Sequence, residues 1–72
     1  GPDGQGDLAD KVRGLAEKYG ISSNDIKNLT ISAALLKLQQ AANAGGDSQD
    51  TGFINSLFAM AQQLGVSNNK IQ

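Results

Sequence analysis

Apolar residues recur along this chain at the spacing of amphipathic helices. Between residues 8 and 19 they stand at i, i+4, i+7, i+8 and i+11, which predicts a helix with one apolar stripe. The members of this stripe are Leu8, Val12, Leu15, Ala16 and Tyr19. Asp7 is the predicted N-cap of the helix, and Gly20 is its predicted end because the residue after a helix often needs a positive φ.

A short second helix is predicted at about residues 23–29. Ser22 is its expected N-cap, since a serine hydroxyl can accept from a free amide in the first turn. Ile21 and Ile26 stand at the two positions whose side chains pack together across the start of a helix. The chain is therefore expected to turn sharply between the first and second helices.

A third helix is predicted to begin at Ser32 and to run to about Ala44. Ile31 and Leu36 are the expected apolar pair across its start. Its other apolar members are Leu35, Leu38, Ala41 and Ala42. Two glycines at 45 and 46 close it.

The segment 45–52 is polar, glycine-rich and without period, which predicts a loop and the most mobile part of the chain. Asp50 or Thr51 is then expected to cap a fourth helix that ends at Gly65. One face of this helix carries Phe53, Ile54, Leu57, Phe58, Ala61 and Leu64, and Met60 lies beside it. So many large apolar residues do not fit a narrow stripe, so this helix is either central to the core or leaves a surface for a partner.

Ser67, with Val66 and Ile71 around it, predicts one turn of a fifth helix. The fold class that follows is all-α, a small bundle of four to five short helices joined at tight corners that contain glycine. Gly1 and Pro2 resemble the remnant that protease removal of an affinity tag leaves, so residues 3–72 form the predicted single helical domain.

Two stretches of the chain share one phrase. AEKYGISSNDIK, at 16–27, returns as AQQLGVSNNKIQ, at 61–72, without a gap and at an offset of 45 residues. This spacing is compatible with one unit of about 45 residues plus part of a second. Each copy predicts a corner at which a helix ends at glycine, an apolar residue enters the core, and a serine starts the next helix.

These corners resemble the helix-turn-helix of DNA-binding proteins, over residues 12–31 and 57–72. The residues that carry the resemblance are Ala16, Gly20, Ile21, Ile26 and Leu29 in the first copy, and Ala61, Gly65, Val66 and Ile71 in the second. The resemblance implies that Ser22, Ser23, Asn24 and Lys27 would face the major groove. The same residues also fit a purely structural corner, because they are the ones that pack the two helices together.

Composition narrows the chemistry that this chain can perform. Its 72 residues contain no Cys and no His, which removes disulfides, thiolate nucleophiles, imidazole bases and the usual zinc ligand sets. The net charge of −1 gives no overall attraction to phosphate or to anionic lipid. No apolar run approaches the roughly 20 residues of a membrane span, and no signal peptide begins the sequence, so the compartment stays open.

No site for a metal, a cofactor or a reaction is predicted. Residues 47–58 imitate the start of a calcium-binding loop, but Phe58 stands where the closing glutamate belongs. The aspartates and Glu17 are better explained as helix caps, surface charges or loop residues than as acid–base pairs. The chain is therefore not expected to be an enzyme.

The predicted function is that of a non-enzymatic helical protein-interaction module, excised from a larger protein, that binds a partner helix or self-associates. The candidate contact residues are Gln39, Gln40, Phe58, Gln62 and Gln63. The alternative is a helix-turn-helix DNA-binding module whose missing cations come from the rest of the parent chain or from a second subunit.

Overall fold

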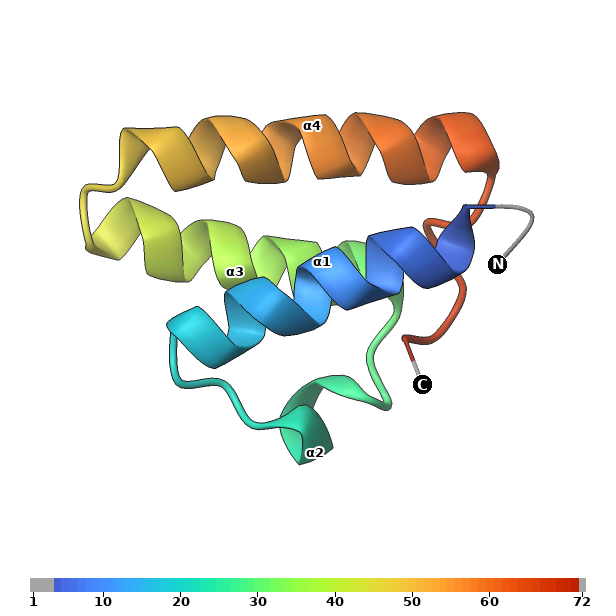
Figure 1. The fold of residues 1–72 in the computed structure, drawn as a ribbon, viewed down its shortest axis with the longest axis horizontal. Coiled ribbons are helices and arrows are strands. Elements are labelled where there is room, and N and C mark those ends of the chain that lie inside the picture. The colour runs from blue at the N-terminus through green and yellow to red at the C-terminus, as the bar shows by residue number, and fades with distance from the viewer. Residues whose placement is uncertain (1–3, 72) are drawn as a thin grey trace.

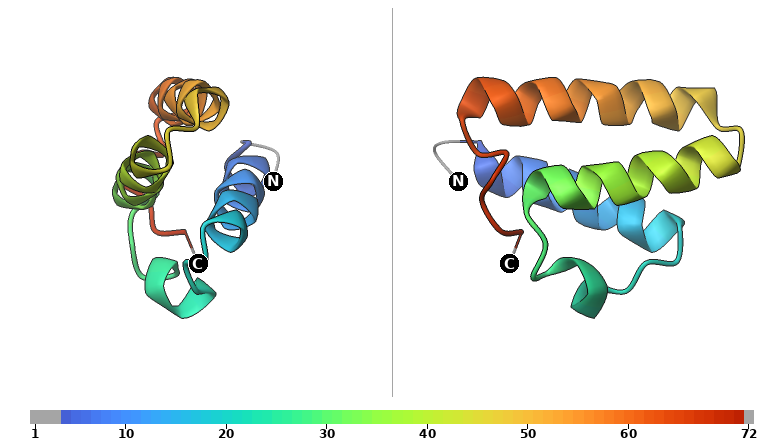
Figure 2. Two further views of the ribbon diagram at one scale, coloured as in Figure 1. Left: turned by 90° about the vertical axis from the view of Figure 1, so that its left-hand side faces the viewer. Right: turned by 180° about the vertical axis from the view of Figure 1, so that it is seen from behind.

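The helices of this chain form a hairpin with a third long helix packed against it. The computed structural model describes residues 4–71, is all-helical there as the sequence predicts, and places the expected remnant Gly1-Pro2 outside the described residues. The helices are α1 (Gln5–Lys18), α2 (Ser23–Ile26), α3 (Ile31–Ala44) and α4 (Ser48–Leu64). Helices α3 and α4 lie side by side and antiparallel, α1 crosses their open side, and α2 lies below α1 (Figures 1 and 2).

The core is assembled from one apolar face of each helix. Among residues 4–71, no buried side chain is polar or charged. The core comprises Leu8, Val12, Leu15, Ala16, Ile26, Ile31, Ala34, Leu35, Leu38, Ala42, Ile54, Leu57, Ala61, Val66 and Ile71. Helix α3 contacts both α1 and α4, and its five buried residues are fully shielded from solvent, so it is the central element of the bundle.

Three helices end at a glycine with left-handed backbone. Gly20, Gly46 and Gly65 have φ of 69°, 69° and 72°, a region that glycine enters without the steric cost that a Cβ imposes. At each of them the next residue donates its amide to the carbonyl five positions earlier, as in a Schellman motif. These bonds are Ile21 to Ala16 at 2.8 Å, Asp47 to Ala42 at 3.1 Å and Val66 to Ala61 at 3.0 Å. The helix ends predicted at these glycines therefore form through local hydrogen bonds.

The predicted start of the first helix is wrong by one turn. Helix α1 begins at Gln5, after Gly4, and Asp7 lies exposed in its first turn instead of capping it. Gly4 has φ of 80°, and a Cβ placed on it would lie 3.1 Å from Cδ1 of Leu64. The positive φ and this close approach explain why the chain enters the helix at a glycine.

The predicted cap of the third helix is also wrong. Thr30, not Ser32, is the N-cap of α3, and its hydroxyl accepts from the amide of Ala33 at 3.0 Å. The amide of Ser32 instead donates to the carbonyl of Ser67 at 3.0 Å. With Ile31 as the first helical residue, Leu36 lies about 140° around the helix from it, so Leu36 is 50% exposed and no apolar pair spans this start.

Helix α4 takes in half of the segment predicted as a loop. Its N-cap is Asp47, whose Oδ1 accepts from the amide of Asp50 at 2.9 Å, so neither Asp50 nor Thr51 is the cap. The polar residues 48–51 form the first helical turn. Their acidic member Asp50 suits this turn because a helix N-terminus carries partial positive charge.

The fifth helix does not form within residues 4–71. Residues 67–69 make turns, and Lys70 forms an isolated antiparallel bridge with Thr30. Ile71 donates its amide to the carbonyl of Leu29 at 3.0 Å, and Ile31 donates to Asn69 at 2.8 Å. The C-terminal segment thus pairs with the chain between α2 and α3, and α2 itself is shorter than the predicted 23–29 because it ends at Ile26.

Candidate functional site

The glutamines predicted to contact a partner lie on the α3–α4 hairpin. Gln40, Gln62 and Gln63 are exposed, whereas Gln39 is half-buried and donates from Nε2 to Oδ1 of Asn55 at 2.7 Å. Phe58 is half-buried and packs against the core. Gln39 and Phe58 therefore help to hold the bundle together, while the other three glutamines present amides to solvent.

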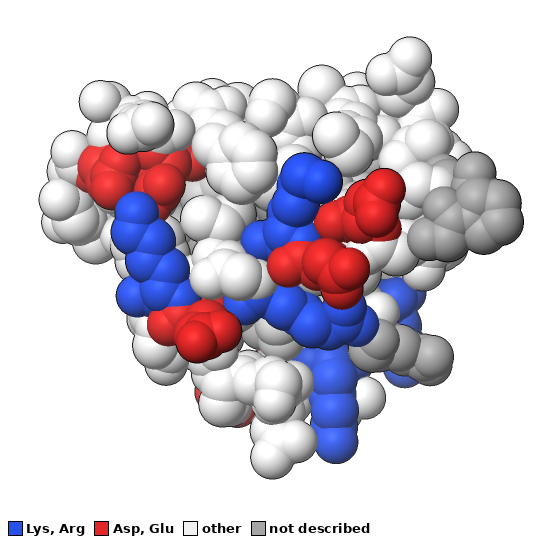
Figure 3. Space-filling view, viewed as in Figure 1, with Lys and Arg blue, Asp and Glu red and all other residues white. Residues whose placement is uncertain are grey.

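Charge is distributed unevenly over the molecule. The sequence has no charged residue from Thr51 to Asn69, which covers nearly all of α4 and the turn that follows it. In Figure 3 the surface over most of α4 is white, and charged side chains gather over α1, at the start of α4 and around α2. Helix α4 thus exposes a surface made of apolar and uncharged polar groups.

Two large apolar residues of α4 lie on its edge beside α1. Phe53 is 41% exposed and Leu64 is 39% exposed, with the half-buried Met60 between them on the same side of the helix. These three residues are called the α4 stripe below. They were predicted on or beside the core face, and their exposure shows that α4 has more apolar surface than its contacts with α1 and α3 cover.

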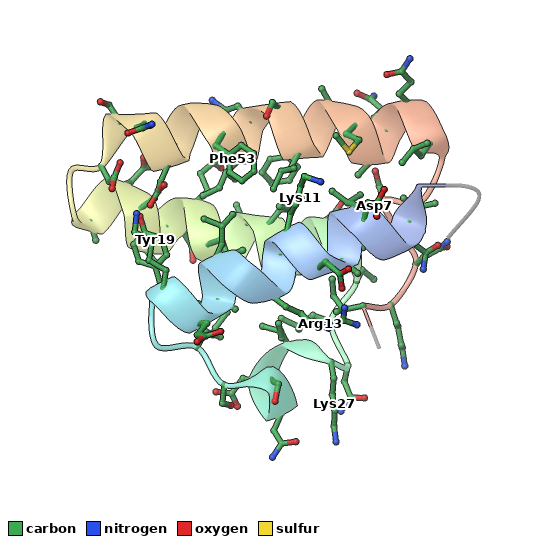
Figure 4. The ribbon with its side chains drawn as sticks, viewed as in Figure 1. Asp7, Lys11, Arg13, Tyr19, Lys27 and Phe53 are labelled. Atoms are coloured by element: carbon green, nitrogen blue, oxygen red, sulfur yellow. The ribbon has the colours of Figure 1, made fainter. Side chains whose placement is uncertain are left out.

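The seam between α1 and α4 runs along this stripe. In Figure 4, Lys11 from α1 and Phe53 from α4 both project into the seam. At one end Gly4 contacts Leu64, and near the middle Gly14 leaves open space, with no atom within 4 Å of a Cβ placed on it. The aliphatic stem of a lysine can lie along apolar surface while its ammonium stays in water. The edge of α1 that borders the stripe is therefore thinly built.

A polar cluster closes the other end of the seam. Lys18 Nζ lies 2.6 Å from Oδ2 of Asp50 and 3.4 Å from Oδ2 of Asp47, and the Tyr19 hydroxyl donates to Asp50. The hydrogen bond to Asp50 raises the pKa of Tyr19 to about 12 and also raises the pKa of Lys18. Hydrogen bonds from Lys18 and then Tyr19 lower the pKa of Asp50. Both donors are thus held protonated near neutral pH, which suits a clamp between α1 and α4 and not a nucleophile or a base.

The residues of the DNA-binding alternative lie at the corner between α1 and α2. Ser22 caps α2, and its Oγ accepts from the amide of Asp25 at 3.2 Å, while Ser23, Asn24 and Lys27 are exposed. Ile26 is buried at 2% exposure. A groove of about 450 Å³ lies along this corner. The helix that would enter the major groove has only four residues.

The described part of the chain offers little to other classes of function. Within residues 4–71, no three acidic, His or Cys side chains are grouped so that they could hold a metal ion. Asp47, the first residue of the calcium-like segment, instead uses its carboxylate as a helix cap. None of the described helices is long and apolar enough to cross a membrane.

Comparison with protein-family models, curated proteins and solved structures finds no match in any of the three. The functional argument therefore depends on the surface of this chain.

Proposed function

We propose that this chain is a non-enzymatic protein-interaction module that binds a partner helix or a second copy through α4. The supporting observation is the α4 stripe, whose end residues Phe53 and Leu64 are 41% and 39% exposed on a helix without charge after Asp50. Cores of protein interfaces are depleted of charged residues and enriched in aromatic residues and methionine. A domain this small has few large apolar side chains, so leaving these two exposed favours an interaction over core packing.

The exposed glutamines fit the polar border of such an interface. Gln63 adjoins Leu64, and Gln62 and Gln40 continue the uncharged surface toward α3. Amide groups can hydrogen-bond to a partner without the desolvation cost of a full charge. The stripe supplies the apolar centre, and the glutamines supply its polar rim.

Stripe-dependent binding tests this function. Wild-type protein, Phe53→Gln, Leu64→Gln and the control Leu36→Gln are immobilised and exposed to an extract of the source organism, with bound proteins quantified by mass spectrometry. The control changes an equally apolar residue that is 50% exposed on α3, outside the stripe. We expect a partner, or free copies of this chain, to bind wild type and Leu36→Gln but not the stripe variants. Binding that ignores the stripe variants would argue against the proposal.

DNA binding is the second candidate, and one observation favours it. Arg13, Lys27 and Lys70 come together from α1, the end of α2 and the C-terminal segment, where Arg13 Nη2 donates to the carbonyl of Ile71 at 3.4 Å and Lys70 bridges to Thr30. Titration with duplex DNA separates the candidates. Affinity that falls steeply with salt supports DNA binding, and absence of binding at about 50 mM salt counts against it.

A further inference from the structure

We propose that the surface which binds the α4 stripe is the same stripe of a second copy, with the two α4 helices antiparallel across a two-fold axis. This inference rests on the proposed function because it uses the same residues, and it goes further by naming the partner and its orientation. Two properties of the chain support it: the spacing of the stripe and the signs of the charges beside it.

The spacing of the stripe is the same in both directions along α4. Phe53, Leu57, Met60 and Leu64 are separated by four, three and four residues. An antiparallel copy therefore sets Phe53 against Leu64 of the partner, and Leu57 against Met60 of the partner, across an axis midway between residues 58 and 59. Because a two-fold interface pairs i with j and j with i, each end of the stripe meets its complement.

The charges on α1 are complementary under the same axis. Helix α1 is antiparallel to α4, since Lys18 contacts Asp50 at one end and Gly4 contacts Leu64 at the other. The level of the axis on α4 thus corresponds to the part of α1 between Asp7 and Lys11. These two residues lie one turn apart on the edge of α1, with Lys11 pointing into the seam (Figure 4). The axis brings Lys11 of one copy toward Asp7 of the other.

No like charges oppose this arrangement along α4, because the helix is uncharged after Asp50. A helix from an unrelated protein could cover the stripe, but nothing on this chain would fix its direction or supply opposite charges at Asp7 and Lys11. The interface is small, since each copy contributes few side chains. Interfaces below about 1,200 Å² belong to the weak and transient class, so a dimer that dissociates on dilution is expected.

Sedimentation velocity over about 10 μM to 1 mM tests the dimer, a range that suits a weak interface. Wild type and Leu36→Gln should show the same concentration-dependent rise from monomer to dimer. Phe53→Gln and Leu64→Gln should each raise the dissociation constant at least about fivefold, as loss of a central apolar contact does. Circular dichroism must show all four proteins equally helical. Wild type that stays monomeric throughout, or a dimer unaffected by the stripe variants, overturns the proposal.

Cysteine pairing tests the orientation, because the chain has no Cys of its own. Under mild oxidation, a mixture of Phe53→Cys and Leu64→Cys should form a mixed disulfide, while each variant alone should form little. In the mixed dimer one Phe53–Leu64 pair becomes the disulfide and the other stays native. Leu36→Cys mixed with Phe53→Cys measures random collision. Disulfides that form equally well within the single variants overturn the antiparallel arrangement.

The two proposals can fail separately. A monomeric chain that still captures a protein in a stripe-dependent manner ends this inference and supports the proposed function. A chain that neither dimerises nor captures any partner through the stripe ends both.

Discussion

Gly14 and Gly65 make a matched pair for testing the backbone of this fold. Both are exposed, and a Cβ placed on either meets no atom within 4 Å. They differ in conformation, because Gly14 lies inside α1 while Gly65 follows α4 with φ of 72° and ψ of 27°. Substitution by alanine adds the same methyl group at both sites, so any difference in stability reports the backbone alone.

The two alanine variants should change stability in opposite directions. Alanine is favoured over glycine by about 1 kcal/mol inside a helix, so Gly14→Ala should raise the free energy of unfolding by about that amount. At Gly65 the left-handed conformation costs alanine about 1–2 kcal/mol, which the lower entropy of the unfolded chain offsets only in part. We expect Gly65→Ala to lower the free energy of unfolding by about 1 kcal/mol.

Thermal and urea unfolding, followed by circular dichroism at low protein concentration, provide the measurement. In a domain of this size 1 kcal/mol corresponds to about 4–8 °C in Tm, so the two variants should differ by about 8–16 °C. Gly52→Ala, in the open interior of α4, should behave as Gly14→Ala does. Gly20→Ala, with φ of 69°, should behave as Gly65→Ala does. A Gly65→Ala protein as stable as wild type would refute the left-handed corner.

Three further variants probe the core, the clamp and a cap. Leu57 is 1% exposed, so Leu57→Ala should cost about 2–5 kcal/mol in urea unfolding, whereas loss of the exposed Leu36 side chain should cost far less. Tyr19 is the only Tyr, and there is no Trp, so ultraviolet absorbance should show it ionising near pH 12; in Asp50→Asn its pKa should fall toward 10, and a wild-type midpoint near 10 contradicts the clamp. Because the pKa of Tyr19 is raised on folding, the clamp should stabilise fully below pH 10, and its contribution should be lost as pH rises from 10 through about 12. Thr30→Ala should lower the free energy of unfolding by about 1 kcal/mol through loss of the cap, and an unchanged urea midpoint would contradict the bond to Ala33.

The helix ends were predictable because their causes are local. Gly20, Gly46 and Gly65 each stop a helix through hydrogen bonds that reach back only five residues. A pattern of apolar residues followed by glycine therefore contains most of the needed information. The all-helical class follows from the same patterns, since no segment alternates with the period of a strand.

The helix starts were less predictable because distant groups satisfy their amides. Ser32 carries a good capping side chain, but its amide donates to Ser67, which lies 35 positions away in the chain. Thr30 then becomes the cap. At α1, the contact between Gly4 and Leu64 is likewise long-range. Local preference among Ser, Thr and Asp is too small to outweigh such tertiary contacts.

The candidate surface was predictable only in part. The excess of apolar residues on α4 is visible in the sequence, as are the glutamines near it. Which edge stays exposed depends on where α1 lies across the hairpin, and Phe53 and Leu64 are uncovered because α1 borders them with Gly4, Lys11 and Gly14. No local pattern gives that placement.

The repeated phrase shows how far local sequence determines structure here. Both copies form the same glycine corner, and the apolar residue five positions after each corner's first apolar residue is buried, at Ile26 and Ile71. Their backbones differ between those points. In the first copy Asp25 occupies the third helical position, where a carboxylate suits the positive end of a helix, while the second copy has Lys70 there, which opposes helix formation. The second copy instead pairs with residues 29–31, so one change of charge and one available backbone partner separate a helix from a strand-like contact in otherwise similar sequences.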